Sequence, residues 1–146
     1  MSESQLEPLS DEACLRYLRE ATVGRIAFVI DGDPVVFPVN YRLVESSPRP
    51  LLAMRTRPGN VIEQAPTSVA FEIDSIDHLR HQGWSVLVRG ELLRATATSE
   101  KLLERYDPDS WLADREALLF IEPWSITGRK LHSADPLWPF RPGEYL

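Results

Sequence analysis

The hydrophobic pattern of this chain changes its period once, near the N-terminus. In residues 11–21 apolar side chains recur every three or four positions, which is the spacing of one helical face. Ser10 precedes this segment as a candidate N-cap, and Asp11 and Glu12 place negative charge in the first turn, where it favours the helix dipole. From residue 23 onward apolar residues alternate or run continuously, which is typical of strands. The pattern therefore predicts a helix followed by a mainly β domain.

Glycine, proline and polar clusters divide the β region into segments. Proline cannot donate to a strand ladder, so Pro38 predicts a sheet edge or a bulge, and Gly90 predicts a bulge in its own strand. A charged loop is expected at 75–82, and short helices at about 60–65 and at 99–106. The predicted strands cover residues 23–30, 35–43, 51–56, 68–74, 83–95 and 118–131, the last being one strand or two, broken near Pro123 or Gly128.

Six or seven strands with two or three short helices leave too few crossovers for a parallel sheet. We therefore expect an antiparallel barrel or sandwich. The chain has 146 residues, a length that predicts one domain. Side chains fill the interior of a small barrel, so a sizeable ligand should bind outside it, in a cleft or between subunits. The tail at 136–146, rich in proline and aromatic residues, is expected to lie along the surface or over a partner subunit.

Composition narrows the function classes. The formal net charge is −6, which argues against nucleic acid as a partner because phosphate binding relies on Lys and Arg. Cys14 is the single cysteine, so the chain has no intramolecular disulfide and no Cys-based zinc cage, and we expect a packed thiol. Residues 1–9 do not resemble a secretory signal, and no stretch approaches the roughly 20 apolar residues of a membrane span. A soluble, cytoplasmic protein is expected.

Other kinds of site find little support in the sequence. His78 and His81 are three residues apart in a predicted loop, which fixes no ligand geometry, and His132 is isolated. Motifs for a nucleophilic serine, a dinucleotide or a P-loop are absent. No metal site is predicted.

One segment has the chemistry of an anion site. Residues 55–60 read Arg-Thr-Arg-Pro-Gly-Asn, so two guanidinium groups and a hydroxyl come at a strand end, before a glycine turn and the start of a predicted helix. Free helix N–H groups and arginine forks both suit phosphate. Two further segments, around Trp84 and Trp124, each combine a tryptophan, a small hydroxyl residue and an arginine close to a glycine. Taken singly, each of the three segments is also compatible with an ordinary turn or a packed core.

Taken together and in order, these segments resemble the pyridoxamine 5′-phosphate oxidase-like flavoproteins, in the branch similar to nitroimidazole reductases. The resemblance covers about residues 9–131. The matching segments are Val-Gly-Arg-Ile-Ala-Phe-Val at 23–29, Asp-Gly-Asp-Pro at 31–34, Pro-Val-Asn-Tyr at 38–41, Arg55-Thr56 with Gly59, Val-Ala-Phe-Glu-Ile-Asp at 69–74, Gly-Trp-Ser-Val at 83–86 with Gly90, and Ile-Thr-Gly-Arg at 126–129.

The resemblance implies a split β-barrel that forms a homodimer and holds FMN in two equivalent clefts between the subunits. By the same resemblance, the strand at 39–41 faces the flavin ring, residues 55–56 approach the ribityl chain and phosphate, and residues 59–61 form the phosphate turn. Later segments close the cleft. The implied cofactor-binding residues are Val39, Asn40, Tyr41, Arg55, Thr56, Gly59, Asn60, Val61, Trp84, Ser85, Trp124 and Arg129.

The function so implied is that of an FMN-dependent oxidoreductase. It would act on an unknown small molecule by hydride transfer at flavin N5, without a nucleophilic side chain. The chain departs from the family pattern after the turn glycine, where Asn60-Val61 replaces the usual lysine-containing pair. Arg55, Arg57 or Arg25 could compensate for that charge. A deazaflavin-dependent reductase and a non-catalytic dimeric barrel that binds flavin or haem remain as alternatives. The pyridoxamine phosphate substrate site has no counterpart here.

Overall fold

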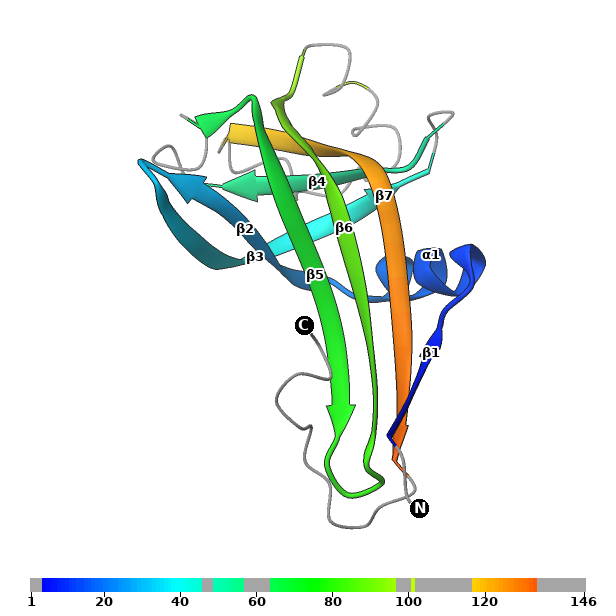
Figure 1. Ribbon diagram of the computed structural model, residues 1–146. Coiled ribbons are helices and arrows are strands. Elements are labelled where there is room, and N and C mark those ends of the chain that lie inside the picture. The colour runs from blue at the N-terminus through cyan, green and yellow to red at the C-terminus, as the bar shows by residue number, and fades with distance from the viewer. Residues whose placement is uncertain (1–3, 46–48, 57–63, 97–100, 102–116, 134–146) are drawn as a thin grey trace.

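A computed structural model of the protein describes residues 4–45, 49–56, 64–96, 101 and 117–133. Within these residues the chain forms one helix, α1, and seven strands (Figure 1). The bounds are Ser4–Pro8 for β1, Asp11–Glu20 for α1, Val23–Ile30 for β2, Asp33–Val44 for β3, Leu51–Thr56 for β4, Thr67–Asp77 for β5, Gln82–Arg94 for β6 and Ala117–Ser133 for β7.

The strands form a mostly antiparallel sheet that closes on itself. Its order is β1-β7-β4-β3-β2-β5-β6, and β6 also pairs with β7, so that six strands make a ring. The long strand β7 serves two parts of the fold, because residues 117–121 pair with β4 whereas residues 129–133 pair with β1. Between these limbs β7 bends, as the orange ribbon in Figure 1 shows. The predicted antiparallel split barrel is confirmed.

The helix begins where the sequence places its cap. The Ala13 amide donates to Ser10 Oγ at 3.1 Å, and Arg19 lies in the last turn. Cys14 and Leu18 on α1 are fully buried against the barrel strands. The predicted packed thiol is thus confirmed, and burial raises the pKa of the Cys14 thiol.

Three features of the β region differ from the expectations. Strand β1 was not predicted, because its short polar segment becomes a strand only by pairing with the distant end of β7. The loop expected at 75–82 is a turn at 78–81, since polar residues on both flanks continue the β5–β6 ladder. The final strand is not broken, and β7 runs continuously through Pro123 and Gly128. The short helices expected near 60–65 and 99–106 fall almost wholly outside the described residues.

Pro38 lies at a sheet edge as predicted, and a bulge is found at the level of Gly90, although its extra residue lies on β7 and not in the strand of Gly90. Asp33–Asn40 of β3 pair with β2, whereas β4 pairs only with Tyr41–Val44, so Pro38 lies on an edge open on its other side within the described strands. In the β6–β7 ladder Arg89 faces Ser125 and Gly90 faces Pro123, which leaves Trp124 as the extra residue of a bulge. Glycine is needed opposite this bulge, because a Cβ at Gly90 would collide with the main-chain oxygen of Glu122.

Gly90→Ala should therefore destabilise the fold by about 1–3 kcal/mol, the cost of overpacking against a main chain that cannot move aside. The urea midpoint of unfolding measures this loss. Ser68→Ala, an exposed change on the neighbouring strand β5, is the matched control and should stay within about 0.5 kcal/mol. Equal midpoints for the two variants would show that the bulge tolerates a methyl group.

Candidate functional site

On β3, strand alternation separates the three residues that the resemblance assigns to the flavin ring. Tyr41 is 1% exposed, and its hydroxyl donates to the Leu18 carbonyl oxygen at 2.7 Å, which anchors α1 to the barrel. Val39 points the same way and packs against the core. Asn40 lies on the outer face and is exposed. Asn40 is therefore the member of this trio whose side chain can reach a ligand outside the barrel.

The backbone of Arg55 and Thr56 lies close to Asn40. The β3–β4 ladder ends with Tyr41 opposite Met54, and Asn40 and Arg55 are the next residues beyond that last pair on the two strands. On its other side the end of β4 pairs with β7, where Arg55 faces Leu118. The fold thus brings together Asn40, Arg55 and Thr56, a set we call the β4-end group. The predicted turn residues Gly59, Asn60 and Val61 lie outside the described residues.

Strand alternation also separates Trp84 from Ser85. The Trp84 ring stacks on Tyr17 of α1, with 4.0 Å between centroids and 20° between planes. Ser85 points to the opposite, outer face, in a row across three strands in which Asp74 and Arg129 are its register partners. The Trp84 indole therefore supports the helix, whereas Ser85 and Arg129 share the outer face.

Within one chain the outer-face row and the β4-end group lie far apart. Arg55 is opposite Leu118 and Ser85 is opposite Arg129, so eleven residues of β7 separate the two groups, about 36 Å along the strand. Figure 1 shows that they belong to different limbs of the bent strand. The bulge residue Trp124, 59% exposed, lies in a third place, a pocket of about 450 Å³ that it lines with α1 and Pro50. The predicted cofactor residues that the structure describes are thus spread over three places in one protomer.

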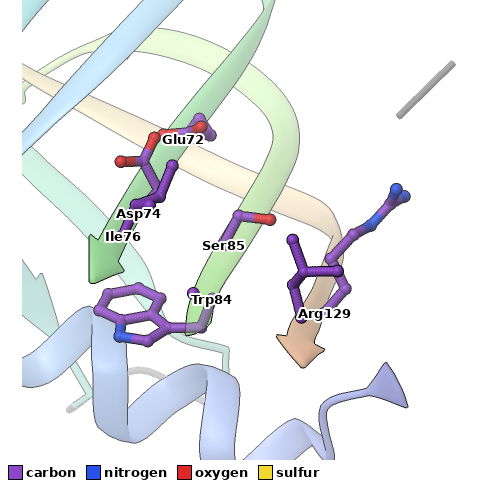
Figure 2. Close-up of a pocket in the computed structure, with 8 residues that line it drawn as sticks. Glu72, Asp74, Ile76, Trp84, Ser85 and Arg129 are labelled. Carbon is purple, nitrogen blue, oxygen red and sulfur yellow. The ribbon is translucent and has the colours of Figure 1, made fainter. Parts of the chain in front are cut away.

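The outer-face row forms a pocket with a volume of about 290 Å³ (Figure 2). Its polar groups come from β5, β6 and β7, and its apolar part from residues nearer the β5–β6 turn. We call it the β5–β7 pocket. Its lining residues are Glu72, Asp74, Ile76, Gly83, Trp84, Ser85, Arg129 and Leu131.

Glu72 and Asp74 form the acidic wall of the β5–β7 pocket. They lie two residues apart on β5 and share the outer face. Arg25 on β2 pairs in register with Glu72, and its Nη1 lies 3.3 Å from Glu72 Oε1 and 3.0 Å from Asp74 Oδ2. In Figure 2 the Arg129 side chain points away from both carboxyl groups. The sequence interpretation missed this pair, although the alternation of residues 68–74 places both on the polar face.

Burial, together with the neighbouring Asp74, shifts the ionisation of Glu72. Burial raises the pKa of Glu72 to about 7, and the hydrogen bond and negative charge of Asp74 act in the same direction, against the opposing effect of Arg25. Near neutral pH the pocket therefore holds a carboxyl group that is about half protonated. Such a group can donate or accept a hydrogen bond, depending on the ligand it meets.

Metal binding and membrane spanning find no support in the part of the chain that the structure describes. Those residues contain no group of three or more His, Cys, Asp and Glu side chains arranged to hold a metal ion. They also contain no helix long and apolar enough to cross a bilayer.

Residues 10–130 match the protein family described as pyridoxamine 5′-phosphate oxidase. An uncharacterized protein of Mycobacterium tuberculosis is 27% identical over 140 residues, which are 89% of this chain and 88% of that protein. An FAD-binding protein from Mycobacterium smegmatis has a solved structure with a TM-score of 0.68 and 26% identity, covering 84% of this chain and 96% of that one. A putative 5-nitroimidazole antibiotic resistance protein from Bacteroides thetaiotaomicron shares the fold, with a TM-score of 0.68, 14% identity and coverage of 91% and 92%. The chain belongs to the pyridoxamine 5′-phosphate oxidase family.

The raised pKa of Glu72 predicts a specific pH dependence of stability. Because the folded state holds this proton up to about pH 7 and the unfolded state releases it near the ordinary value of 4.5, the free energy of unfolding should fall as pH rises from about 5 to 7.5. Glu72→Gln cannot titrate and should show a weaker fall, measured by urea denaturation at several pH values. Glu91→Gln removes an exposed carboxylate on β6 and should retain the wild-type slope. Parallel profiles for the wild type and Glu72→Gln would contradict the assignment.

Proposed function

We propose that this member of the pyridoxamine 5′-phosphate oxidase family is a flavin-dependent oxidoreductase that acts on a small molecule. The observation that carries the proposal is the family match over residues 10–130, which spans nearly the whole described barrel. The structural similarity to a protein named as FAD-binding supports the choice of a flavin. When bound, a flavin supplies hydride transfer at N5, so the chain itself needs only to bind, orient and tune.

Asn40, Ser85 and Arg129 on the outer face, together with the residue types at the end of β4, fit the requirements of a flavin. Asn40 offers an exposed amide that can both donate to and accept from the polar edge of a planar ring. The edge of β3 along Asp33–Asn40 adds main-chain groups that none of the described strands pairs with on that side. Arg55 and Thr56, at the end of β4, bring residue types that suit a phosphate tail. Ser85 and Arg129 offer a hydroxyl and a cation to the opposite side of such a ligand.

A site that uses both groups needs two copies of the chain. Eleven residues of β7, about 36 Å along a strand that bends between its two limbs, separate the β4-end group from the row containing Ser85 and Arg129, so the two groups lie on different limbs of one protomer. A two-fold dimer would set the outer-face row of one protomer against the β4-end group of its partner, making two equivalent sites. Exposed apolar side chains on β2 and β3 offer surface for such contact: Val29, Val36 and Phe37 are 56%, 61% and 36% exposed. We therefore propose a homodimer with the cofactor between its subunits.

The proposed cofactor is FMN. The segment Asn60-Val61 provides no lysine for a phosphate, so the charge must come from arginines such as Arg55. Mass spectrometry of the small molecule released from purified protein should give the mass of FMN, and the native protein should absorb near 450 nm. If the released molecule has the mass of FAD or of a deazaflavin, the family assignment stands and that molecule replaces FMN as the proposed cofactor. Protein that gains no thermal stability from any of the three would overturn flavin binding.

Mutant complementation tests the two-copy site. Arg55→Ala and Arg129→Ala should each weaken flavin binding at least about tenfold, the effect of losing one charge-assisted contact. When the two variants are unfolded together and refolded as a mixture, half of the dimers should contain one chain of each kind. Every mixed dimer then has one site with both arginines intact and one site with neither. We expect tight binding to return at about a quarter of all sites, as measured by flavin fluorescence quenching.

The control mixes each variant with itself, which should restore nothing. Sedimentation equilibrium should show a dimer for the wild type and for both variants. A site built within one chain would show no recovery in the mixture, and a stable monomer that binds flavin tightly would overturn the two-copy arrangement.

A further inference from the structure

The bulge in β7 places a large aromatic side chain at the surface. Trp124 is the extra residue of this bulge, and its side chain is 59% exposed, whereas tryptophan is on average largely buried. Gly90 opposite leaves room for the displaced main chain. Bulges redirect a side chain out of the alternation of its strand and are frequent beside active sites. The indole is therefore exposed by a specific main-chain feature of a paired strand.

Trp124 lines a pocket of about 450 Å³, a volume that suits a small organic molecule. We call it the β7-bulge pocket. Three segments that are far apart in the sequence enclose it: the first turns of α1, the residues just before β4, and the bulge itself. The Leu9 amide donates to the Gly128 carbonyl oxygen at 2.9 Å, which holds the start of α1 beside this part of β7.

The floor of the β7-bulge pocket faces away from the residues proposed to hold the flavin. Ile126 lines the pocket, pairs in register with buried Val88 and packs against the core. Arg129 comes three residues later on the same strand, so strand alternation turns it to the outer face together with Ser85. A ligand in the β7-bulge pocket therefore occupies a different place from the proposed flavin.

The interior of the β7-bulge pocket favours a planar apolar group. Leu15 and Ile126 pack against the core, so they form a floor that is held in place from behind. Pro50 and Pro123 add ring carbons to the lining. The indole of Trp124 adds an exposed aromatic surface, on which a second ring gains both buried area and stacking.

Two opposite charges line the β7-bulge pocket without pairing with each other. Asp11 contributes a carboxylate from the first turn of α1, and Arg49 contributes a guanidinium from the segment before β4. Within the part of the chain that the structure describes, neither side chain forms an ion pair. A ligand with one positive and one negative group can satisfy both, whereas a singly charged ligand meets a like charge in the same pocket.

We infer that the β7-bulge pocket binds an aromatic amino acid or a closely related aromatic zwitterion. The ring of the ligand lies on the Trp124 indole, its carboxylate accepts from the planar fork of Arg49, and its ammonium group donates to Asp11. This site is independent of the proposed function, and it gives Trp124, which the family resemblance assigns to the cofactor, a separate ligand. No motif marked the site, because its three polar and aromatic groups come from three separate segments.

L-Phenylalanine is a suitable probe because analogues lacking one charge are available. 3-Phenylpropionate lacks the ammonium group, and 2-phenylethylamine lacks the carboxylate. Isothermal titration calorimetry of the purified full-length protein at pH 7 should show one saturable L-phenylalanine site per chain, with each analogue binding at least about tenfold more weakly. Equal affinity for the three compounds, or no saturable binding of L-phenylalanine, would overturn the inference.

Charge variants assign each contact. Asp11→Asn should remove the preference for L-phenylalanine over 3-phenylpropionate, and Arg49→Gln should remove its preference over 2-phenylethylamine. Two matched controls should keep both preferences. Glu12→Gln removes the neighbouring carboxylate of the same helical turn, which does not line the pocket, and Arg80→Gln removes an exposed guanidinium at the β5–β6 turn. A variant that folds, as judged by circular dichroism, and still keeps the wild-type preferences would contradict the contact it removes.

The aromatic contact has a spectroscopic readout. L-Phenylalanine should change the tryptophan fluorescence of the wild type, and Trp124→Phe should lose this change while retaining binding by calorimetry. Trp124→Ala should weaken binding severalfold, because the stacking surface is lost. Arg55→Ala, which is expected to weaken flavin binding, should leave L-phenylalanine binding unchanged. Unchanged affinity in Trp124→Ala, or joint loss of both ligands in Arg55→Ala, would overturn a separate site on Trp124.

Discussion

The pairing of β7 on both of its sides is the constraint on which the rest of the structure depends. Its first limb joins β4 and its whole length follows β6, so the barrel closes only because one strand bends between the two neighbours. The bulge at Trp124 lies within this bend, and extra residues of this kind strengthen local twist. The same strand then carries Arg129 to a limb remote from Arg55. Barrel closure and the division of the candidate cofactor residues are therefore two consequences of one long strand.

Most of the fold could be predicted from the spacing of apolar residues along the chain and from the residues that favour turns. The helix with its Ser10 cap and the edge position of Pro38 follow from local rules that act within a few residues. Strand β1 could not be predicted in this way, because Ser4–Pro8 have no alternating apolar pattern and become a strand only by pairing with β7, about 125 residues later. The turn at 78–81 was placed too broadly for a similar reason, since ladder partners rather than hydrophobicity hold its flanks.

The candidate site was predicted less completely than the fold, and alternation explains part of the difference. Side chains of adjacent strand residues point to opposite faces, so the Trp84 ring packs on Tyr17 of α1 whereas the Ser85 hydroxyl points outward; this rule was available from the sequence alone. The same rule puts Glu72 and Asp74 together. Their partner Arg25 could not be identified, because its Glu72 contact spans 47 residues and depends on the β2–β5 register. The residue types of a site can be read from the local sequence. The charge balance of a pocket can be predicted only when the pairing of its strands is known.

The charges on the two limbs of the barrel also favour one orientation of a flavin in the proposed dimer. A flavin carries its negative charge on the phosphate tail, whereas its ring is neutral. The Glu72–Asp74 wall would repel a phosphate, and the residue types at the end of β4, Arg55 and Thr56, would attract one. In the proposed assembly the tail should therefore lie on the β4-end group of one protomer, leaving the ring to approach the acidic pocket of the other.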